Sequence, residues 1–383
     1  MNPKPISRAL LNVITPKLFK GKAIIILGPR QTGKTTLLKA LTAGIDKPKQ
    51  WINCDDPTSQ RLLEGATIAS LRSIIGSDQL IVVDEAQRVR NIGLTLKLVT
   101  DEFKHVQLLV SGSSALELAN EINEPLTGRK WEYLLYPISW GELVHSTSFT
   151  SAMQQLEQRL LYGMYPEVVT NPGREKELLN QIVSSYLYKD LLSFKGIRKP
   201  ELLDKLLRAL ALQLGQEVSY NELANLLQVD KGTVSDYIYL LEQAFIVARL
   251  QPLSRNLRSE IGTMRKLYFW DLGVRNALIG NFNPLSIRSD AGAVWENFLI
   301  VERMKHLHYN SDYGNKYFWR TKAQQEIDYV EERDGRLFAY EFKMNPKAKY
   351  KFSKTFTSAY PEASTEVIHV ENFHDFLTKP FLL

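Results

Sequence analysis

Residues 23–36 read Ala-Ile-Ile-Ile-Leu-Gly-Pro-Arg-Gln-Thr-Gly-Lys-Thr-Thr, and this stretch decides the fold of the N-terminal part of the chain. The apolar run at 23–27 predicts a buried strand, and a helix is expected to begin at Lys34. Gly28, Gly33 and Lys34 stand in the spacing G-x-x-x-x-G-K-T, which is typical of a phosphate-binding loop. The glycines let backbone N–H groups turn toward phosphate oxygens, and the helix N-terminus adds positive potential.

The loop therefore predicts a site for a nucleoside triphosphate, with ATP as the expected nucleotide. Lys34 is expected to reach the β- and γ-phosphates, and the Thr35 hydroxyl is expected to ligate Mg²⁺. The residues predicted to line the nucleotide are Gly28, Pro29, Arg30, Gln31, Thr32, Gly33, Lys34, Thr35 and Thr36.

Composition limits the class of protein. The 383 residues suffice for two or three domains, and apolar and charged fractions of 44% and 23% are typical of globular proteins. The one cysteine, Cys54, excludes a disulfide framework and a cysteine-based zinc site. No apolar run reaches the ~18–20 residues of a membrane span, and no signal peptide is recognisable. We expect a cytoplasmic protein, whose net charge of +6 permits nucleic-acid binding without arguing for it.

A second buried strand is predicted at 80–84 and ends in two carboxylates, Asp84 and Glu85. At the carboxyl end of a parallel strand, Asp84 would hold Mg²⁺ and Glu85 would polarise the attacking water. One strand, at 50–54, is expected between the loop and this acidic strand, an arrangement typical of the additional-strand P-loop NTPases. A helix cap or a surface ion pair is the alternative explanation for the two carboxylates.

Two further residues are candidates for contact with the γ-phosphate. Ser111 follows a predicted strand at 106–110 and opens the run Ser-Gly-Ser-Ser (111–114), although ordinary turn chemistry explains a serine there equally well. Arg129 precedes a predicted strand at 131–135 and is expected to read the γ-phosphate in its own subunit or in a neighbouring one. A structural salt bridge is the rival explanation for Arg129. Contact with the γ-phosphate of a neighbouring subunit would imply a homo-oligomer.

Several blocks together resemble one bacterial and archaeal group of AAA-type ATPases that carry a nuclease-like C-terminal domain of unknown function. They are the phosphate loop, Val-Asp-Glu-Ala-Gln (83–87), Ser-Gly-Ser-Ser (111–114), Leu-Thr-Gly-Arg (126–129) and Pro-Ile-Ser-Trp-Gly-Glu (137–142). The resemblance continues through 162–167, where Met164 replaces a usual glycine, and through Lys-Leu-Tyr-Phe-Trp-Asp-Leu-Gly (266–273). It covers nearly the whole chain.

The middle of the chain, residues 151–255, is predicted to be helical and is expected to form a lid followed by a winged helix-turn-helix. Helices at 219–227 and 233–245 and a strand at 246–250 make the second pattern. The second helix carries Asp236 and Glu242, and its only nearby base is Lys231. Helices that read DNA present Arg, Lys, Asn or Gln to base edges. We therefore favour packing or protein contact here.

The last part, residues 256–383, is predicted to be αβββαβ, with a helix at 293–300, strands at 316–320, 326–332 and 337–343, a helix at 352–359 and a strand at 365–370. Asp334-Gly335 is a strong signal for a two-residue hairpin turn. A symmetric hairpin about this turn places Asp328 opposite Glu341, with Cβ atoms about 4.5–5.5 Å apart. Lys343 lies on the same face.

An Asp followed by Glu-x-Lys on a hairpin resembles the core of PD-(D/E)xK nucleases. That resemblance implies that Asp328 and Glu341 bind Mg²⁺, with Glu296 as a third carboxylate, and that Glu341 and Lys343 take part in cleavage. Glu-Ile-Asp (326–328) replaces the Pro-Asp that names the superfamily. A solvated ion-pair cluster is the alternative. The lysines at 343–354 fit either a solvated loop or a phosphate contact.

We therefore expect an α/β P-loop NTPase domain with a parallel sheet (1–150), a helical and winged-helix middle (151–255) and an α+β nuclease-like domain (256–383). The leading hypothesis is a Mg²⁺-dependent ATPase that acts on nucleic acid, DNA rather than RNA. The alternative is a nucleotide-gated switch that binds a protein partner and has an inert last domain. A transcription regulator working through the winged helix is a weaker third option.

Overall fold

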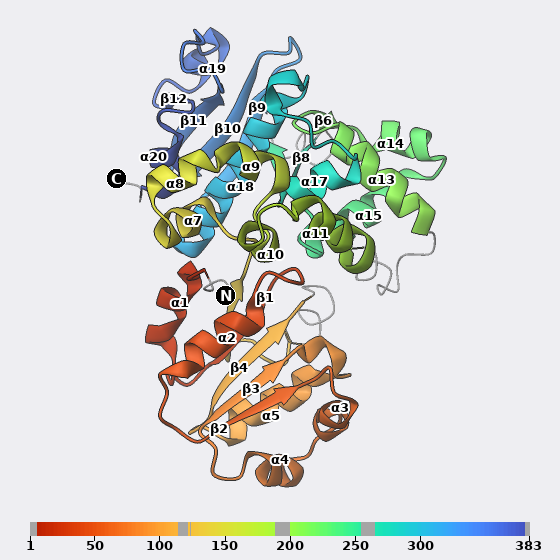
Figure 1. The fold of residues 1–383 in the computed structure, drawn as a ribbon, viewed down its shortest axis with the longest axis vertical. Helices are drawn as coiled ribbons and strands as arrows, with labels where there is room; N and C mark the ends of the chain where they lie inside the picture. Colours follow the sequence, from red (N-terminus) through yellow and green to blue (C-terminus); the bar gives the residue numbers. More distant parts are fainter. Residues whose placement is uncertain (1–5, 114–121, 123, 188–199, 254–264, 380–383) are drawn as a thin grey trace. The chain divides into compact units, whose positions relative to one another are not determined.

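The computed structural model describes residues 6–113, 122, 124–187, 200–253 and 265–379 (Figure 1). The chain divides into two compact units. Unit 1 comprises residues 1–138 and 243–245, and unit 2 comprises residues 139–242 and 246–383. The first unit therefore ends before residue 150, and the finer division into three domains stays a prediction.

Unit 1 is built on a parallel sheet of five strands in the order β2-β3-β4-β1-β5. The strands are β1 (Ala23–Leu27), β2 (Lys49–Asn53), β3 (Leu80–Asp84), β4 (Gln107–Gly112) and β5 (Lys130–Leu134). β1, β3 and β4 are buried along their whole length, which explains their unbroken apolar runs. The strand inserted between β1 and the acidic strand β3 is β4, whereas the strand predicted at 50–54 forms the sheet edge as β2.

The helices of unit 1 begin where the sequence offers caps. Asp56 accepts hydrogen bonds from the backbone of α3, and Thr67 forms a capping box with Ser70 at the start of α4. The helical elements are α1 (Ala9–Ile14), η1 (Thr15–Lys17), α2 (Lys34–Ala43), α3 (Pro57–Leu63), α4 (Ile68–Ile75), η2 (Ala86–Arg88) and α5 (Ile92–Glu102).

Unit 2 contains a mixed sheet of seven strands in the order β12-β11-β10-β9-β7-β8-β6 (Figure 1). β7 runs parallel to β9, β11 runs parallel to β12, and the other neighbours are antiparallel. The strands are β6 (Glu217–Val218), β7 (Val247–Pro252), β8 (Arg265–Phe269), β9 (Asn315–Arg320), β10 (Glu326–Arg333), β11 (Arg336–Phe342) and β12 (Ser364–Ile368).

The predicted hairpin register is confirmed. Tyr329 pairs with Tyr340 and Arg333 with Arg336, as a symmetric turn at Asp334-Gly335 requires. Asp334 and Gly335 both have positive φ, 48° and 75°, which is the geometry of a two-residue type I′ turn. The order αβββαβ is also confirmed, from α18 (Ala291–Tyr309) through α19 (Lys354–Ala359) to β12, and α20 (Phe373–Thr378) follows it unpredicted.

The remaining helices of unit 2 precede α18. The helix predicted to start at Thr233 begins two residues earlier, because Asp230 accepts the Thr233 N–H and caps it. The winged-helix assignment stays a prediction. These helices are α7 (Trp140–Ser146), α8 (Phe149–Gln154), α9 (Leu156–Tyr162), α10 (Pro166–Thr170), α11 (Glu175–Gln181), η3 (Ile182–Leu187), α13 (Pro200–Leu212), α14 (Tyr220–Leu227), α15 (Lys231–Gln243), α17 (Leu272–Leu278) and η4 (Leu285–Ile287).

Two of the sequence blocks lock together in the core of unit 2. The buried carboxylate of Asp271 accepts hydrogen bonds from the N–H groups of Met164 (2.6 Å) and Val274 (3.0 Å). A Cβ on Gly163 would lie 2.2 Å from an Asp271 oxygen, so this position has no room for a side chain. The block at 162–167 and the block at 266–273 are therefore parts of one packing arrangement.

An aromatic cluster explains why α7 belongs to unit 2. The Trp140 ring packs against Phe373 (centroids 5.1 Å apart) and Phe298 (6.0 Å), and Trp295 contacts both phenylalanines. The Trp140 N–H donates to Glu302, 162 residues further along the chain. No helix in the described ranges is long and apolar enough to cross a membrane.

Candidate functional site

The loop between β1 and α2 has the tight geometry that a phosphate-binding loop requires. A Cβ on Gly28 would lie 2.2 Å from the Leu135 carbonyl oxygen, and Gly33 has a left-handed φ of 92°. The Lys34 side chain is buried, and its Nζ donates to the carbonyl oxygens of Gly28 and Pro29, both at 2.9 Å. The ammonium is thus held against the loop from which it would meet phosphate.

The structure brings the two predicted magnesium ligands of unit 1 together. Thr35 Oγ1 donates to Asp84 Oδ2 at 2.9 Å, and Ser111 Oγ donates to the other oxygen, Oδ1. Ser111 is fully buried, so its hydroxyl orients the Asp84 carboxylate from the protein interior. Among the described residues, the side chains that bond the Asp84 carboxylate are two neutral hydroxyls, which do not cancel its negative charge. The donor set fits a Mg²⁺ ion.

Glu85 lies just beyond the end of β3 in a left-handed conformation, with φ 56°. Its N–H donates to Ser111 Oγ at 3.1 Å. Gln87 Nε2 donates to Glu85 Oε2 (2.6 Å) and to Ser113 Oγ (2.8 Å), and Ser113 N–H donates to Gln87 Oε1 (3.2 Å). Gln87 therefore fixes the Glu85 carboxylate relative to the end of β4. In the sequence, Gln87 stands out only as a member of the 83–87 block, which assigns it no role.

A second residue that sequence reasoning missed is Arg8, which is 7% exposed. Its guanidinium donates to the carbonyl oxygens of Thr32 (2.5 Å) and Tyr136 (2.6 Å). It thereby ties the phosphate loop to the segment after β5. Arg8 precedes α1 in no recognisable motif, so only the three-dimensional structure reveals this contact.

The other predicted loop residues differ in exposure. Pro29 and Thr32 are buried, and the Thr32 hydroxyl donates to the Pro29 carbonyl at 2.8 Å. Arg30 and Gln31 are half-buried, and Thr36 is exposed on α2. Ser114 lies outside the described residues.

Arg129 lies at the opposite edge of the sheet from the phosphate loop. Its carbonyl accepts the N–H of Ala23, the first residue of β1, so the length of β1 (about 16 Å) separates it from Gly28. Its Nε donates to Asp101 Oδ1 at 2.6 Å in a surface ion pair. This placement does not support contact with the nucleotide of its own subunit and matches the rival salt-bridge explanation. A role toward a neighbouring subunit stays a prediction.

Unit 2 gathers four carboxylates, which we call the acidic site: Glu296, Glu326, Asp328 and Glu341. Asp328 Oδ2 accepts the backbone N–H of Phe342 at 2.8 Å, in line with the predicted hairpin pairing. Lys343 Nζ donates to Glu341 Oε1 at 2.6 Å. Glu341 is 5% exposed, and its Oε2 is buried without a hydrogen-bond partner among the residues that the structure describes.

A lysine that we did not predict at this site, Lys266 of β8, lies among these carboxylates. It is 1% exposed, and its Nζ lies 3.0 Å from Glu296 Oε1 and also contacts the Glu326 carboxylate. The Tyr268 hydroxyl donates to the same Glu296 oxygen at 2.6 Å. Arg320 contacts the other Glu326 oxygen at 3.1 Å. The sequence showed Lys266 only as the first letter of the 266–273 block.

Burial dominates the electrostatics of the acidic site. Loss of hydration, together with the nearby charges of Glu296 and Glu341, raises the pKa of Asp328 well above its usual range. Burial also raises the pKa of Glu341, against the opposing effect of Lys343. Burial alone would lower the pKa of Lys266, but Glu296, Glu326 and Asp328 outweigh it, so this pKa lies above its ordinary value.

The predicted metal ligands of unit 2 lie near one another, but their side chains do not surround a common position for a metal ion. Throughout the part of the chain that the structure describes, no three His, Cys, Asp or Glu side chains are grouped so that they could hold a metal ion. Glu296 Oε1 faces Lys266 and Tyr268 instead. The residues present therefore do not fit a divalent ion, and the ligand set remains a sequence prediction.

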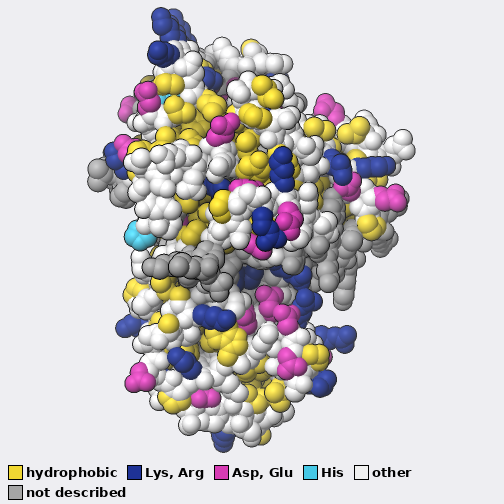
Figure 2. All heavy atoms as spheres, in the orientation of Figure 1, with side chains coloured by type: hydrophobic (Ala, Val, Ile, Leu, Met, Phe, Trp, Pro, Cys, Tyr) yellow, Lys and Arg dark blue, Asp and Glu magenta, His cyan; other side chains and the backbone are white. Residues whose placement is uncertain are grey.

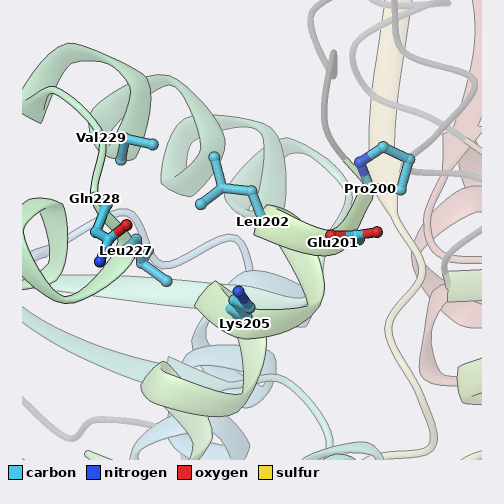
Figure 3. Close-up of a pocket in the computed structure, with 7 residues that line it drawn as sticks. All are labelled: Pro200, Glu201, Leu202, Lys205, Leu227, Gln228 and Val229. Carbon is cyan, nitrogen blue, oxygen red and sulfur yellow. The ribbon is translucent and has the colours of Figure 1, made fainter.

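A separate cleft of about 530 Å³ lies between α13 and the end of α14 (Figure 3). None of the predicted site residues contributes to it. Its charged side chains, Glu201 and Lys205, both come from α13. The full lining is Pro200, Glu201, Leu202, Lys205, Leu227, Gln228 and Val229.

The parallel sheet, the tight loop after β1 and the contact between Thr35 and Asp84 define unit 1 as a P-loop ATPase domain. Residues 20–144 match an AAA domain family. Residues 153–285 and 291–376 match two domains of unknown function, DUF8612 and DUF4143. The function of unit 2 is therefore not given by its family matches.

Relatives of known sequence span most of the chain. Uncharacterized protein Rv2008c of Mycobacterium tuberculosis is 27% identical over 332 residues, which are 85% of this chain and 71% of that protein. An uncharacterized protein of Haemophilus influenzae is 24% identical over 291 residues, 73% of this chain and 68% of that protein. Uncharacterized protein MJ1544 of Methanocaldococcus jannaschii is 22% identical over 340 residues, 82% and 73%.

Among solved structures, the fold is similar to that of the Walker-type ATPase PABY2304 of Pyrococcus abyssi. The TM-score is 0.50 at 16% identity, over 72% of this chain and 96% of that one. This likeness concerns the fold alone, and it agrees with a P-loop ATPase.

Proposed function

We propose that the chain is a Mg²⁺-dependent ATP hydrolase. The observation that carries this proposal is the 2.9 Å hydrogen bond from Thr35 Oγ1 to Asp84 Oδ2. It joins the hydroxyl that follows the loop lysine to the carboxylate at the end of β3, which are the two groups that hold Mg²⁺ in P-loop enzymes. This pairing is not expected in a strand-to-helix turn that binds no nucleotide.

The residues around this contact divide the chemistry between them. Thr35 and Asp84 would hold Mg²⁺, which supplies charge neutralisation on the β- and γ-phosphates. Lys34 would exchange its bonds to loop carbonyls for bonds to phosphate oxygens. Glu85 would orient the attacking water and accept its proton, and Gln87 would keep the Glu85 carboxylate in place.

We further propose that unit 2 contacts nucleic acid through an exposed lysine patch. The patch comprises Lys347, Lys349, Lys351 and Lys354, all of which are exposed. Figure 2 shows Lys and Arg side chains gathered at the end of unit 2 that carries α19. Closely spaced, solvated ammonium groups suit a sequence-independent contact with phosphates. Duplex DNA is the first partner to test.

A protein partner is a second candidate, favoured by a different surface of unit 2. Leu226 of α14 is 64% exposed, and Tyr239 of α15 is 51% exposed. Both lie in the predicted helix-turn-helix, whose second helix carries few basic side chains. Exposed apolar side chains on neighbouring helices suit contact with protein rather than with phosphate.

One assay series tests these proposals. Phosphate release would be measured for the natural chain and for Lys34→Ala, with and without duplex DNA or RNA at increasing salt. We expect turnover that Lys34→Ala abolishes, and DNA stimulation that falls steeply with salt. Turnover that survives Lys34→Ala would contradict the ATPase proposal. Turnover that nucleic acid leaves unchanged would contradict the nucleic-acid proposal and favour a protein partner.

A further inference from the structure

The acidic site of unit 2 contains its own cations. Lys266 extends into it from β8 and Arg320 from β9, while Lys343 directly follows the last residue of β11. Each of these three side chains contacts at least one of the four carboxylates. Most of the negative charge is therefore balanced by side chains of this chain.

Lys266 is the decisive member because it is the most deeply buried cation of the three. Its side chain is 1% exposed, against 24% for Arg320 and 35% for Lys343. It bridges a carboxylate on α18, Glu296, and one at the start of β10, Glu326. A cation buried between two carboxylates has the surroundings that a metal ion in an acidic site has.

We propose that the Lys266 ammonium is the resident cation of the acidic site, and that it excludes a divalent metal ion from it. A positive charge within a few ångströms repels a second cation strongly where water is scarce. Unit 2 would then bind nucleic acid without cleaving it by a metal-dependent route. This inference deepens the proposed function of unit 2 and is independent of ATP hydrolysis in unit 1.

The available oxygens support the same conclusion. Glu296 Oε1 accepts from both Lys266 and Tyr268, and Asp328 Oδ2 accepts from the Phe342 backbone. Glu341 Oε1 accepts from Lys343, and among the described residues Glu341 Oε2 is buried without a hydrogen-bond partner. Waters usually supply several positions of the octahedral Mg²⁺ shell, so the decisive obstacle is the Lys266 ammonium, which already lies between the Glu296 and Glu326 carboxylates.

The test is a direct count of bound Mn²⁺ by electron paramagnetic resonance, on the full chain without nucleotide. An Asp84→Asn background removes the proposed carboxylate ligand of unit 1. In that background we expect no Mn²⁺ bound at millimolar concentration while Lys266 is present. Lys266→Met, which keeps the length of the side chain and removes its charge, is expected to raise Mn²⁺ affinity about a hundredfold or more. A further Glu296→Gln change should abolish that gain.

Two controls make the experiment decisive. Lys316→Met removes another partly buried lysine of unit 2, on β9, and should leave Mn²⁺ binding unchanged. Lys266→Gln is measured in parallel, with circular dichroism to show that each variant is folded. Mn²⁺ binding with Lys266 intact that Glu341→Gln removes would overturn the proposal, and this arm needs no lysine variant. Folded Lys266→Met and Lys266→Gln chains that gain no Mn²⁺ would overturn it as well.

Discussion

The carboxylates of the two units are held by different kinds of partner. In unit 1, Asp84 accepts hydrogen bonds from two hydroxyls, those of Thr35 and Ser111. In unit 2, Glu296 and Glu341 face the ammonium groups of Lys266 and Lys343. Hydroxyls orient a carboxylate and leave its charge for a metal ion, whereas ammonium groups cancel it. We therefore expect the charge of the partners, rather than the number of carboxylates, to determine which of the two sites binds a metal ion.

Removing the charge of Asp84 is expected to have the largest effect on ATP hydrolysis. We expect Asp84→Asn to lower kcat for ATP hydrolysis about 10²–10³-fold, as the loss of a preorganised charge contact does in other enzymes. Phosphate release under saturating ATP and Mg²⁺ measures it. Asp46→Asn, on an exposed loop, is the matched control and should retain full activity. An active Asp84→Asn enzyme would refute the assigned role.

Acid pH is expected to destabilise unit 2 through two histidines of α18. Burial lowers the pKa of both His306 and His308 to about 4, so the folded chain keeps them neutral where the unfolded chain protonates them near pH 6.5. Their contribution to stability is complete above about pH 6.5 and is lost as the pH falls toward 4. We expect a loss of about 1–3 kcal/mol over this range.

Urea unfolding followed by tryptophan fluorescence measures this pH dependence, and Trp140 and Trp295 report on the core of unit 2. His306→Gln combined with His308→Gln should flatten the dependence between pH 6.5 and 4. An unchanged slope in that variant would assign the acid sensitivity to other groups.

The hydrogen bonds that hold the Glu85 carboxylate can be removed without changing its charge. Gln87→Leu removes the hydrogen bonds that join Glu85 to Ser113 and keeps the size of the side chain. We expect about a tenfold fall in kcat with an unchanged KM for ATP, because in the proposed mechanism Gln87 would position the base and would not bind the nucleotide. Thr95→Val, which removes a hydrogen bond from α5 to Leu63 O elsewhere in unit 1, is the control. A rise in KM with constant kcat would contradict a positioning role.

The smallest expected effect concerns the acidic site. Glu341→Gln should change kcat for ATP by less than about twofold, because this carboxylate is balanced within unit 2 and has no part in the chemistry of unit 1. The same assay measures it. A large loss of ATPase activity in a folded Glu341→Gln chain would show that the acidic site controls the nucleotide site.

The sequence predicted well wherever local pattern determines geometry. The spacing from Gly28 to Thr35 fixes a loop, and Asp334-Gly335 fixes a hairpin register that follows from the alternation of side chains along strands. The contact of Lys266 with Glu326 depends instead on how β8, β7, β9 and β10 are ordered in the sheet. No periodicity encodes that order.

Long-range packing explains the other differences from prediction. Trp140 follows the last strand of unit 1 closely in sequence, yet its ring packs on Phe298 and Phe373 of unit 2. The boundary therefore falls at residue 138 rather than 150. Arg8 shows the same limit, since its partners Thr32 and Tyr136 are 24 and 128 residues away.

The discontinuity of unit 1 has a consequence for protein engineering. Residues 243–245 belong to unit 1 although both neighbouring segments belong to unit 2, and the Phe245 ring contacts Tyr136 edge-on with centroids 6.3 Å apart. A gene truncated after residue 138 would encode an ATPase domain without this ring, exposing an aromatic face beside the carbonyl that Arg8 binds. A minimal ATPase would therefore have to carry the 243–245 segment on a grafted linker.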